Sequence, residues 1–99
     1  MGAQSQVRTV YAGAEVDVRC ALFDGDTCFV TFSPANAHAS GWAEELLLKR
    51  QVSAVHLVAK WNHWWQPDEV RDAVRLAAEI VHGRHYRKVV TYGASMGGY

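Results

Sequence analysis

The apolar and polar positions of this chain change period along its length, and the two periods separate expected strands from expected helices. Residues 15–22 alternate strictly, with Val16, Val18, Cys20 and Leu22 on one side and mostly charged residues between them. A spacing of two is typical of a strand with one buried face. From alternation, or from short apolar runs bounded by turn residues, we expect strands at 7–12, 15–22, 27–32, 53–59 and 88–92.

Two segments carry a helical period instead. At 67–82, charged residues fill one side, and the apolar residues that recur every three or four positions are Val70, Ala73, Val74, Ala77 and Val81. Pro67 suits the first position of this helix, and Gly83 can end it. A shorter helix is expected at 40–50, where Ser40 can act as N-cap. Its apolar side would carry Trp42, Leu46 and Leu47.

The order of these elements predicts an α/β fold. Gly13-Ala14 can join the first two strands in a tight hairpin, and strands then alternate with helices. Alternation of this kind implies right-handed crossovers between parallel strands. The last strand, 88–92, is a β-branched and aromatic run that we expect to be a buried parallel strand.

Composition limits the classes of partner. The chain has 99 residues, 49% apolar residues and a formal net charge of zero, which is ordinary for one soluble globular domain. A chain with no net charge has no basic field for nucleic acid or an anionic membrane. No apolar run approaches the roughly 18 residues that span a bilayer, and residues 1–9 lack a signal-peptide core. We therefore expect a cytoplasmic protein with neither nucleic acid nor membrane as partner.

Cys20 and Cys28 are the two cysteines of the chain. They lie in strand-like segments without metal-ligand spacing, so buried thiols are the preferred interpretation over metal ligands. The sequence also has no phosphate-binding glycine loop and no paired carboxylates. We expect neither a metal nor a cofactor.

The main candidate for chemistry is Ser95, in the pentapeptide Gly93-Ala94-Ser95-Met96-Gly97, directly after the 88–92 run. In a G-x-S-x-G turn the glycines relieve crowding around a strained serine, whose hydroxyl is raised above the carboxyl edge of the sheet. The N–H groups that follow the serine can hold an oxyanion at a helix start. The alternative is a glycine-rich strand-to-helix turn without catalytic meaning.

In this motif and in the order of its elements, the chain resembles the N-terminal part of an α/β-hydrolase, and its elbow is similar to those of small serine esterases. The resemblance implies an antiparallel hairpin leading into parallel strands with crossover helices, in the order one-two-four-three-five. Residues 1–99 would form an incomplete part of a single domain, truncated after the fifth strand. With the fourth strand between them, Cys20 and Cys28 would lie about 10 Å apart, too far for a disulfide.

The resemblance also implies an oxyanion hole and a triad. The first oxyanion donor would be the backbone N–H of Met96, and the second would come from the loop after the third strand. Pro34 has no N–H, so Ala35 is preferred there, with Asn36 as the alternate. The acid and the histidine of the family follow the serine, whereas all five histidines here precede it. His38 and His63, in loops at strand ends, could in principle approach the serine; structural or solvent roles are expected for His56, His82 and His85.

Trp61, Trp64 and Trp65 follow the fourth strand and allow two interpretations. They could form an aromatic wall for an acyl or sugar group, or they could pack a long loop over the following helix.

Together these features predict part of a serine hydrolase that acts on a small ester or related acyl substrate through Ser95 and is inactive as these residues alone. A serine acyltransferase is an enzymatic alternative, because the elbow does not distinguish water from an alcohol as acceptor. A non-enzymatic interaction fragment is another. It would bind a second chain through the open edge at 88–92, where self-association is also expected.

Overall fold

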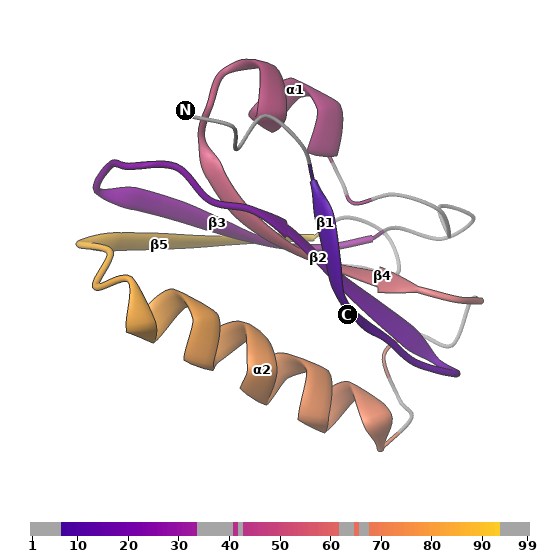
Figure 1. Ribbon diagram of the computed structural model, residues 1–99. Helices are drawn as coiled ribbons and strands as arrows, with labels where there is room; N and C mark the ends of the chain where they lie inside the picture. The colour runs from indigo at the N-terminus through magenta and orange to yellow at the C-terminus, as the bar shows by residue number, and fades with distance from the viewer. Residues whose placement is uncertain (1–6, 34–40, 42, 62–64, 66–67, 94–99) are drawn as a thin grey trace.

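A single mixed sheet carries a helix on each of its faces (Figure 1). The computed structural model describes residues 7–33, 41, 43–61, 65 and 68–93. The strands are β1 Arg8–Ala12, β2 Val16–Ala21, β3 Thr27–Phe32, β4 Ser53–Ala59 and β5 Lys88–Gly93. The helices are α1 Glu44–Lys49 and α2 Glu69–Gly83. The expectation of an α/β domain is confirmed at this level.

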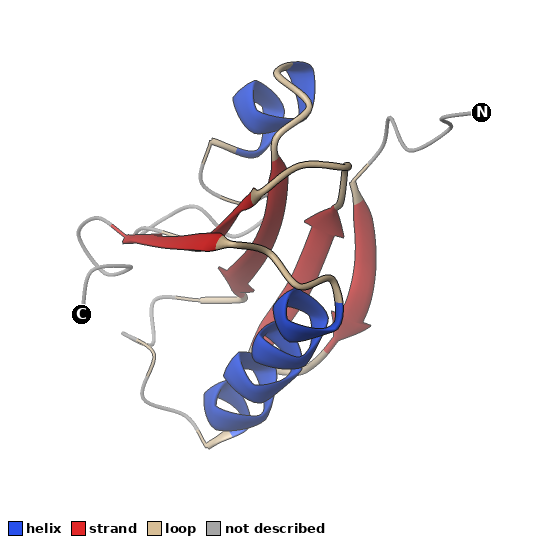
Figure 2. Ribbon diagram, turned by 90° about the vertical axis from the view of Figure 1, so that its left-hand side faces the viewer, coloured by secondary structure: helices blue, strands red, loops and turns tan. Residues whose placement is uncertain are grey.

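The strand order is β1-β2-β4-β3-β5, as expected. Strand β2 is antiparallel to both of its neighbours, whereas β3 pairs in parallel with β4 and β5. The chain turns between β1 and β2 at Gly13, whose N–H donates to the Val16 carbonyl at 3.0 Å, so the expected hairpin is also confirmed. Helix α1 connects β3 to β4, and α2 connects β4 to β5 across the opposite face (Figure 2).

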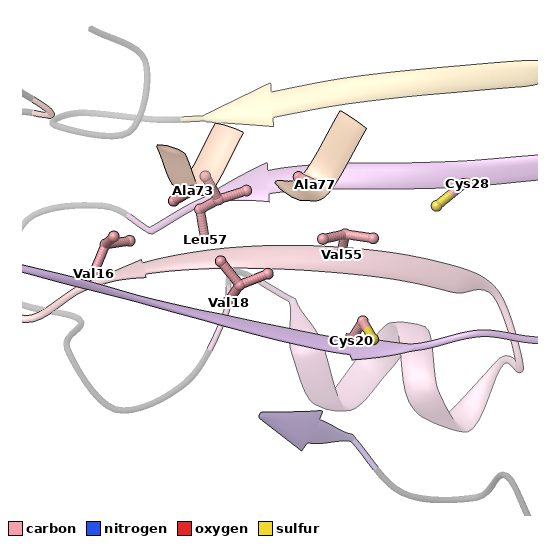
Figure 3. Close-up of a cluster of buried hydrophobic side chains, with 8 residues drawn as sticks. All are labelled: Val16, Val18, Cys20, Cys28, Val55, Leu57, Ala73 and Ala77. Atoms are coloured by element: carbon pink, nitrogen blue, oxygen red, sulfur yellow. The ribbon is translucent and has the colours of Figure 1, made fainter. Parts of the chain in front are cut away.

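The main hydrophobic core lies between α2 and the sheet (Figure 3). Alternate residues of the central strands point to this face and meet two small residues of the helix. Small side chains let the helix approach closely, so the aliphatic side chains beneath it are fully excluded from water. The cluster consists of Val16, Val18, Cys20, Cys28, Val55, Leu57, Ala73 and Ala77.

Strand β4 is buried along its whole length, because both of its faces are covered. Val55 and Leu57 face α2, and the alternating positions Ala54, His56 and Val58 face the other layer. Helix α1 closes that layer with Leu47, which is 8% exposed. A strand covered on both faces is the centre of the domain.

Three expectations about burial were wrong. Strand β5 pairs in parallel as predicted and lies at the edge of the described sheet, as the open edge expected at 88–92 implied, but it is largely exposed where a buried strand was expected. Val74 and Leu46 were placed on apolar helix faces, yet they are 41% and 54% exposed.

Helix α1 also begins later than expected, at Glu44 rather than near Ser40, which lies outside the described residues. Its N-cap residue Ala43 has a left-handed backbone, with φ 54°, and no side chain caps the helix there. The Glu44 side chain instead accepts a hydrogen bond from the Gly41 N–H at 2.6 Å. This bond ties the first helical residue to the segment that precedes the helix and does not cap the N–H groups of its first turn.

Candidate site at the carboxyl edge of the sheet

The predicted elbow leaves the sheet beside the end of β3. Gly93, its first residue, is the last residue of β5 and pairs with Phe32, the last residue of β3. The two strands are parallel, so the chain leaves both at the same edge. The site residues that sequence alone predicts at this edge lie outside the described residues: Ser95, Met96, Ala35, Asn36 and Trp64.

The loop predicted to hold the second oxyanion donor is fixed at its first residue. Ser33 is fully buried directly after β3. Its N–H donates to the Leu57 carbonyl at 3.0 Å, and its Oγ accepts a hydrogen bond from the Ala59 N–H at 2.9 Å. These bonds extend the β3–β4 pairing by one residue and tie the loop to the end of β4.

The same loop is fixed again near α1. The Glu44 carboxylate accepts hydrogen bonds from the Gly41 N–H and from two nitrogens of the Arg19 guanidinium. Arg19 Nε lies 3.0 Å from Oε1, and Arg19 Nη2 lies 2.7 Å from Oε2. Burial raises the pKa of Glu44, but the hydrogen bonds from Arg19 and Gly41 outweigh it, so the net pKa is lowered. An ion pair with two parallel hydrogen bonds fixes the orientation of the Arg19 and Glu44 side chains as well as the distance between them.

Gly41 is required by the close approach of the chain to His56. A Cβ at this position would lie 2.3 Å from Cγ of the imidazole, well inside any real contact. His56 is itself 1% exposed, and its Nδ1 lies 2.6 Å from Thr31 Oγ1. Burial lowers the pKa of His56 to about 4, so the ring is neutral at pH 7. The expected structural role of His56 is confirmed.

Pairing across the sheet places these groups in one polar row. Thr9 pairs with Arg19, Arg19 with His56, His56 with Thr31, and Thr31 with Tyr92. The row crosses all five strands on the face that carries α1, and Arg19 Nη1 also donates to Thr9 Oγ1 at 3.2 Å. The face opposite the hydrophobic core is therefore organised by hydrogen bonds.

The two described tryptophans of the predicted aromatic wall have different partners. Trp65 meets Phe32 edge to face, with ring centroids 5.3 Å apart, and packs against the core. Trp61 is 50% exposed, and its Nε1 donates to Glu15 Oε1 at 2.5 Å. The contact of Trp65 fits the packing interpretation, and it lies beside the strand end that precedes the elbow. The aromatic wall stays a prediction.

An open apolar groove with a volume of about 580 Å³ lies on the α2 side, away from the polar row. Its lining includes Val30 and Phe32 of β3, Val89 and Thr91 of β5, and Val74, Ala77 and Val81 of α2. His82 and His85 are also lining residues; both are exposed, which fits the structural or solvent role expected for them, and their ring centroids lie 6.3 Å apart. His38 and His63, the other two candidates for a base, lie outside the described residues.

The two thiols are free and buried, as expected, and β4 lies between their strands. Burial raises the pKa of Cys28 to about 11 and also raises that of Cys20. Within the described part of the chain, no three histidine, cysteine or acidic side chains gather as a metal site would require. Neither described helix is long and apolar enough to cross a membrane.

Sequence reasoning did not find the contacts among Arg19, Glu44 and His56. The alternation of 15–22 places Arg19 on the side opposite the apolar residues, and it does not show what Arg19 contacts there. The available signal was His56 itself, a polar residue inside the apolar run 53–59. A buried polar side chain needs a partner, so that position required other polar groups nearby.

No family model, curated protein or solved structure matches the chain.

Proposed function

We propose that residues 1–99 are the front part of an α/β-hydrolase domain in which Ser95 is the nucleophile of a serine hydrolase. The observation that carries the proposal is the position of the motif. G-x-S-x-G follows a parallel strand, β5, at the carboxyl edge, beside the strand end that begins the predicted oxyanion loop. This strand context is what gives the pentapeptide its meaning.

The strand connections add support. The chain leaves β3 through α1 on one face, and it returns from β4 to β5 through α2 on the other. In open α/β sheets, ligands bind at the carboxyl ends of two adjacent strands whose following connections cross opposite faces of the sheet. A small acyl substrate at this edge would meet the elbow on one side and the loop after Ser33 on the other.

The anchoring of that loop suits an oxyanion hole. Donors stabilise a tetrahedral intermediate only when they are held in place before the charge develops. Ser33 fixes one end of the loop to β4, and Gly41 with Glu44 fixes the other to β2. Ala35, with Asn36 as the alternate, lies between these anchors in sequence and would supply the second N–H, while Met96 would supply the first.

The proposed chemistry is acyl transfer. Ser95 Oγ attacks the carbonyl carbon of an ester, its proton passes to a base, and the alkoxide leaves as an alcohol once protonated. Water then releases the acid, or another alcohol accepts the acyl group if the protein is a transferase. The base and its orienting acid would follow the elbow, as in the family that the chain resembles.

The test uses the reading frame that contains residues 1–99. Its continuation should encode an acidic residue and then a histidine, and its product should hydrolyse a p-nitrophenyl ester and react with a fluorophosphonate. Ser95→Ala should lower kcat/KM by about 10³-fold or more. Ser5→Ala, at a serine outside every expected element, is the matched control and should leave kcat/KM unchanged.

The chain of residues 1–99 alone should show no ester turnover above Ser95→Ala. Serine-dependent turnover by these residues alone would contradict the requirement for a following base. A frame without a downstream acid and histidine would contradict the enzyme assignment itself. His38→Ala and His63→Ala in the longer product test the remaining candidates for a base, and neither should change the rate.

A further inference from the structure

The two helices are held on the sheet in different ways. Helix α2 has 15 residues and packs on the main hydrophobic core, to which it contributes Ala73 and Ala77. Helix α1 has six residues, Glu44–Lys49, and only Leu47 among them is buried. A helix this short is unstable by itself in water, so α1 depends on its contacts with the sheet.

The backbone is strained at both ends of α1. Ala43 before the helix and Gln51 after it have φ values of 54° and 55°, in the left-handed region that favours glycine. After the helix, the Gln51 N–H donates to the Leu48 carbonyl at 3.0 Å, and the Val52 N–H donates to the Leu47 carbonyl at 2.9 Å. The C-terminal end of α1 therefore continues into β4 through a tight turn that its own backbone closes.

The N-terminal end of α1 is held by a polar clasp, which consists of Arg19, Gly41, Glu44 and His56. Glu44 binds the guanidinium of Arg19 and the N–H of Gly41, and Gly41 lies against the buried ring of His56. Among the described residues, charge and hydrogen bonding thus hold this end of α1, whereas apolar burial holds α2.

We propose that α1 and Gly41 open from the sheet as one unit about the turn at Gln51, while the sheet and α2 stay folded, and that a positive charge on His56 favours this opening. The inference does not rest on the proposed function. Segments with few buried apolar contacts open locally in folded proteins, at a lower cost than global unfolding. Opening would bring water to the face of β4 that carries Ala54 and His56.

The charges around His56 explain why its protonation would favour the open form. Arg19 pairs with His56 across β2 and β4, so an imidazolium would face a guanidinium in a buried layer. The residue of β3 that pairs with His56 is a neutral threonine. Glu44 of α1 acts on His56 but already binds Arg19, and Asp17 on the same face of β2 is paired with Lys60 at 3.3 Å. Water around the open form would screen the two cations from each other.

The direction of the pH effect follows from burial. In the closed form the pKa of His56 is about 4, whereas a solvated imidazole has a pKa of about 6.5, so opening takes up a proton between these values. Burial raises the pKa of Glu44, but its hydrogen bonds lower it overall, so opening also favours protonation there, at lower pH. From His56 alone, opening should be about twentyfold more frequent at pH 5 than at pH 7.

The experiment measures thiol reactivity in the chain that carries Ala54→Cys, with an aromatic disulfide reagent that reacts in acid. Ala54 is 1% exposed on the α1 face of β4, whereas the native thiols of Cys20 and Cys28 are buried in the core under α2. Mass spectrometry of peptides follows each thiol, and each rate is divided by that of the unfolded chain at the same pH. The introduced thiol should react about tenfold faster than the native thiols, or more, and its rate should not change in low urea, because local opening exposes little surface.

Two variants separate local opening from unfolding and test the role of the imidazole. Ala78→Gly, at an exposed position of α2, weakens the fold without touching α1. It should speed the reaction of Cys20 and Cys28 about fivefold and leave that of the introduced thiol unchanged. In His56→Leu with Thr31→Val, no ring titrates, so the introduced thiol should lose its rise between pH 7 and pH 5. Circular dichroism checks that each variant is folded.

An introduced thiol that reacts only as fast as Cys20 and Cys28, with the same rise in urea, would overturn the proposal, because α1 would then leave the sheet only on global unfolding. Equal normalised rates at pH 7 and pH 5 would overturn the role of His56. If Ala54→Cys unfolds the chain, Leu47→Cys places the thiol on the helix, where its reaction must show the same insensitivity to urea. None of these readouts involves an ester, so the failure of this inference and the failure of the proposed function are separate results.

Discussion

His56 Nδ1 and Thr31 Oγ1 share a hydrogen bond of 2.6 Å between neighbouring parallel strands, inside the domain. The imidazole is neutral there because burial penalises its charged form. On the other side of His56 lies Arg19, which Glu44 neutralises. Because this hydrogen-bonded pair is buried between two central strands, protonation of His56 should affect the stability of the sheet.

Acid should destabilise the domain through His56. Its pKa is about 4 in the folded chain and about 6.5 when unfolded, so the unfolded state binds a proton first as the pH falls. The free energy of unfolding should therefore drop by about 2 kcal/mol between pH 7 and pH 5 from this residue. Urea unfolding followed by circular dichroism at the two pH values measures the drop.

The control for this prediction replaces both partners. In the double variant His56→Leu with Thr31→Val, neither polar group is left buried alone, and no imidazole titrates at this position. The drop between pH 7 and pH 5 should shrink by about the same 2 kcal/mol. An unchanged drop would show that other groups carry the acid sensitivity.

The ion pair between Glu44 and Arg19 should contribute much more to stability than an exposed pair. Glu44→Ala leaves a partly buried guanidinium, whose side chain is 26% exposed, and the Gly41 N–H without their partner, so it should cost about 2 kcal/mol. Asp72→Ala, in an exposed pair with Arg75 at 4.0 Å, should cost less than about 0.5 kcal/mol. Similar losses for both variants in chemical unfolding would contradict the assigned role of Glu44.

Substitution of Gly41 should be far more damaging than substitution of Gly83. A Cβ at Gly41 would overlap the buried ring of His56, whereas a Cβ at Gly83 meets nothing within 4 Å. Gly41→Ala should destabilise the fold by about 1–3 kcal/mol or more, since the surrounding core must shift. Gly83→Ala should be neutral or stabilising by up to about 1 kcal/mol. The midpoint of thermal unfolding compares the two, and equal midpoints would refute the close packing.

Both thiols should be unreactive in the folded chain. Cys20 and Cys28 are buried, and their raised pKa values disfavour the thiolate that attacks disulfide reagents. Reaction with a chromogenic disulfide at pH 8 should therefore be slow and should rise steeply in urea, at the concentration where circular dichroism reports unfolding. Fast reaction of either thiol before that transition would mean that its strand opens locally.

The sequence was sufficient for the elements and for their order. Alternation in 15–22 and the stripe of 67–82 report burial on a repeating period, and both segments lie where they were expected. The bounds of β3 and β4 also match. Periodicity failed where burial depends on what covers a surface. The β-branched and aromatic residues of 88–92 predicted a buried strand, yet β5 lies at the edge of the described sheet and is largely exposed.

For the candidate site too, the sequence predicts what depends on local motifs and misses what depends on tertiary contacts. A local signal, the G-x-S-x-G motif, makes Ser95 the candidate nucleophile, and local chemistry excludes Pro34 as a candidate donor. The anchors of the loop were not predictable, because Arg19 and Glu44 are 25 residues apart and meet only through the fold. Alternation showed that Arg19 leaves the hydrophobic core but not what it meets on the other face.

The polar row has one more consequence, which concerns the alignments that β4 could adopt. Its sequence, Ser-Ala-Val-His-Leu-Val-Ala, is apolar on both sides of the histidine, so hydrophobicity alone distinguishes poorly between neighbouring positions. A slip of one residue would turn His56 into the aliphatic layer beneath α2 and set a leucine or valine against Arg19. The imidazole of His56 thus makes shifted registers unfavourable, so β4 has one stable register in the sheet.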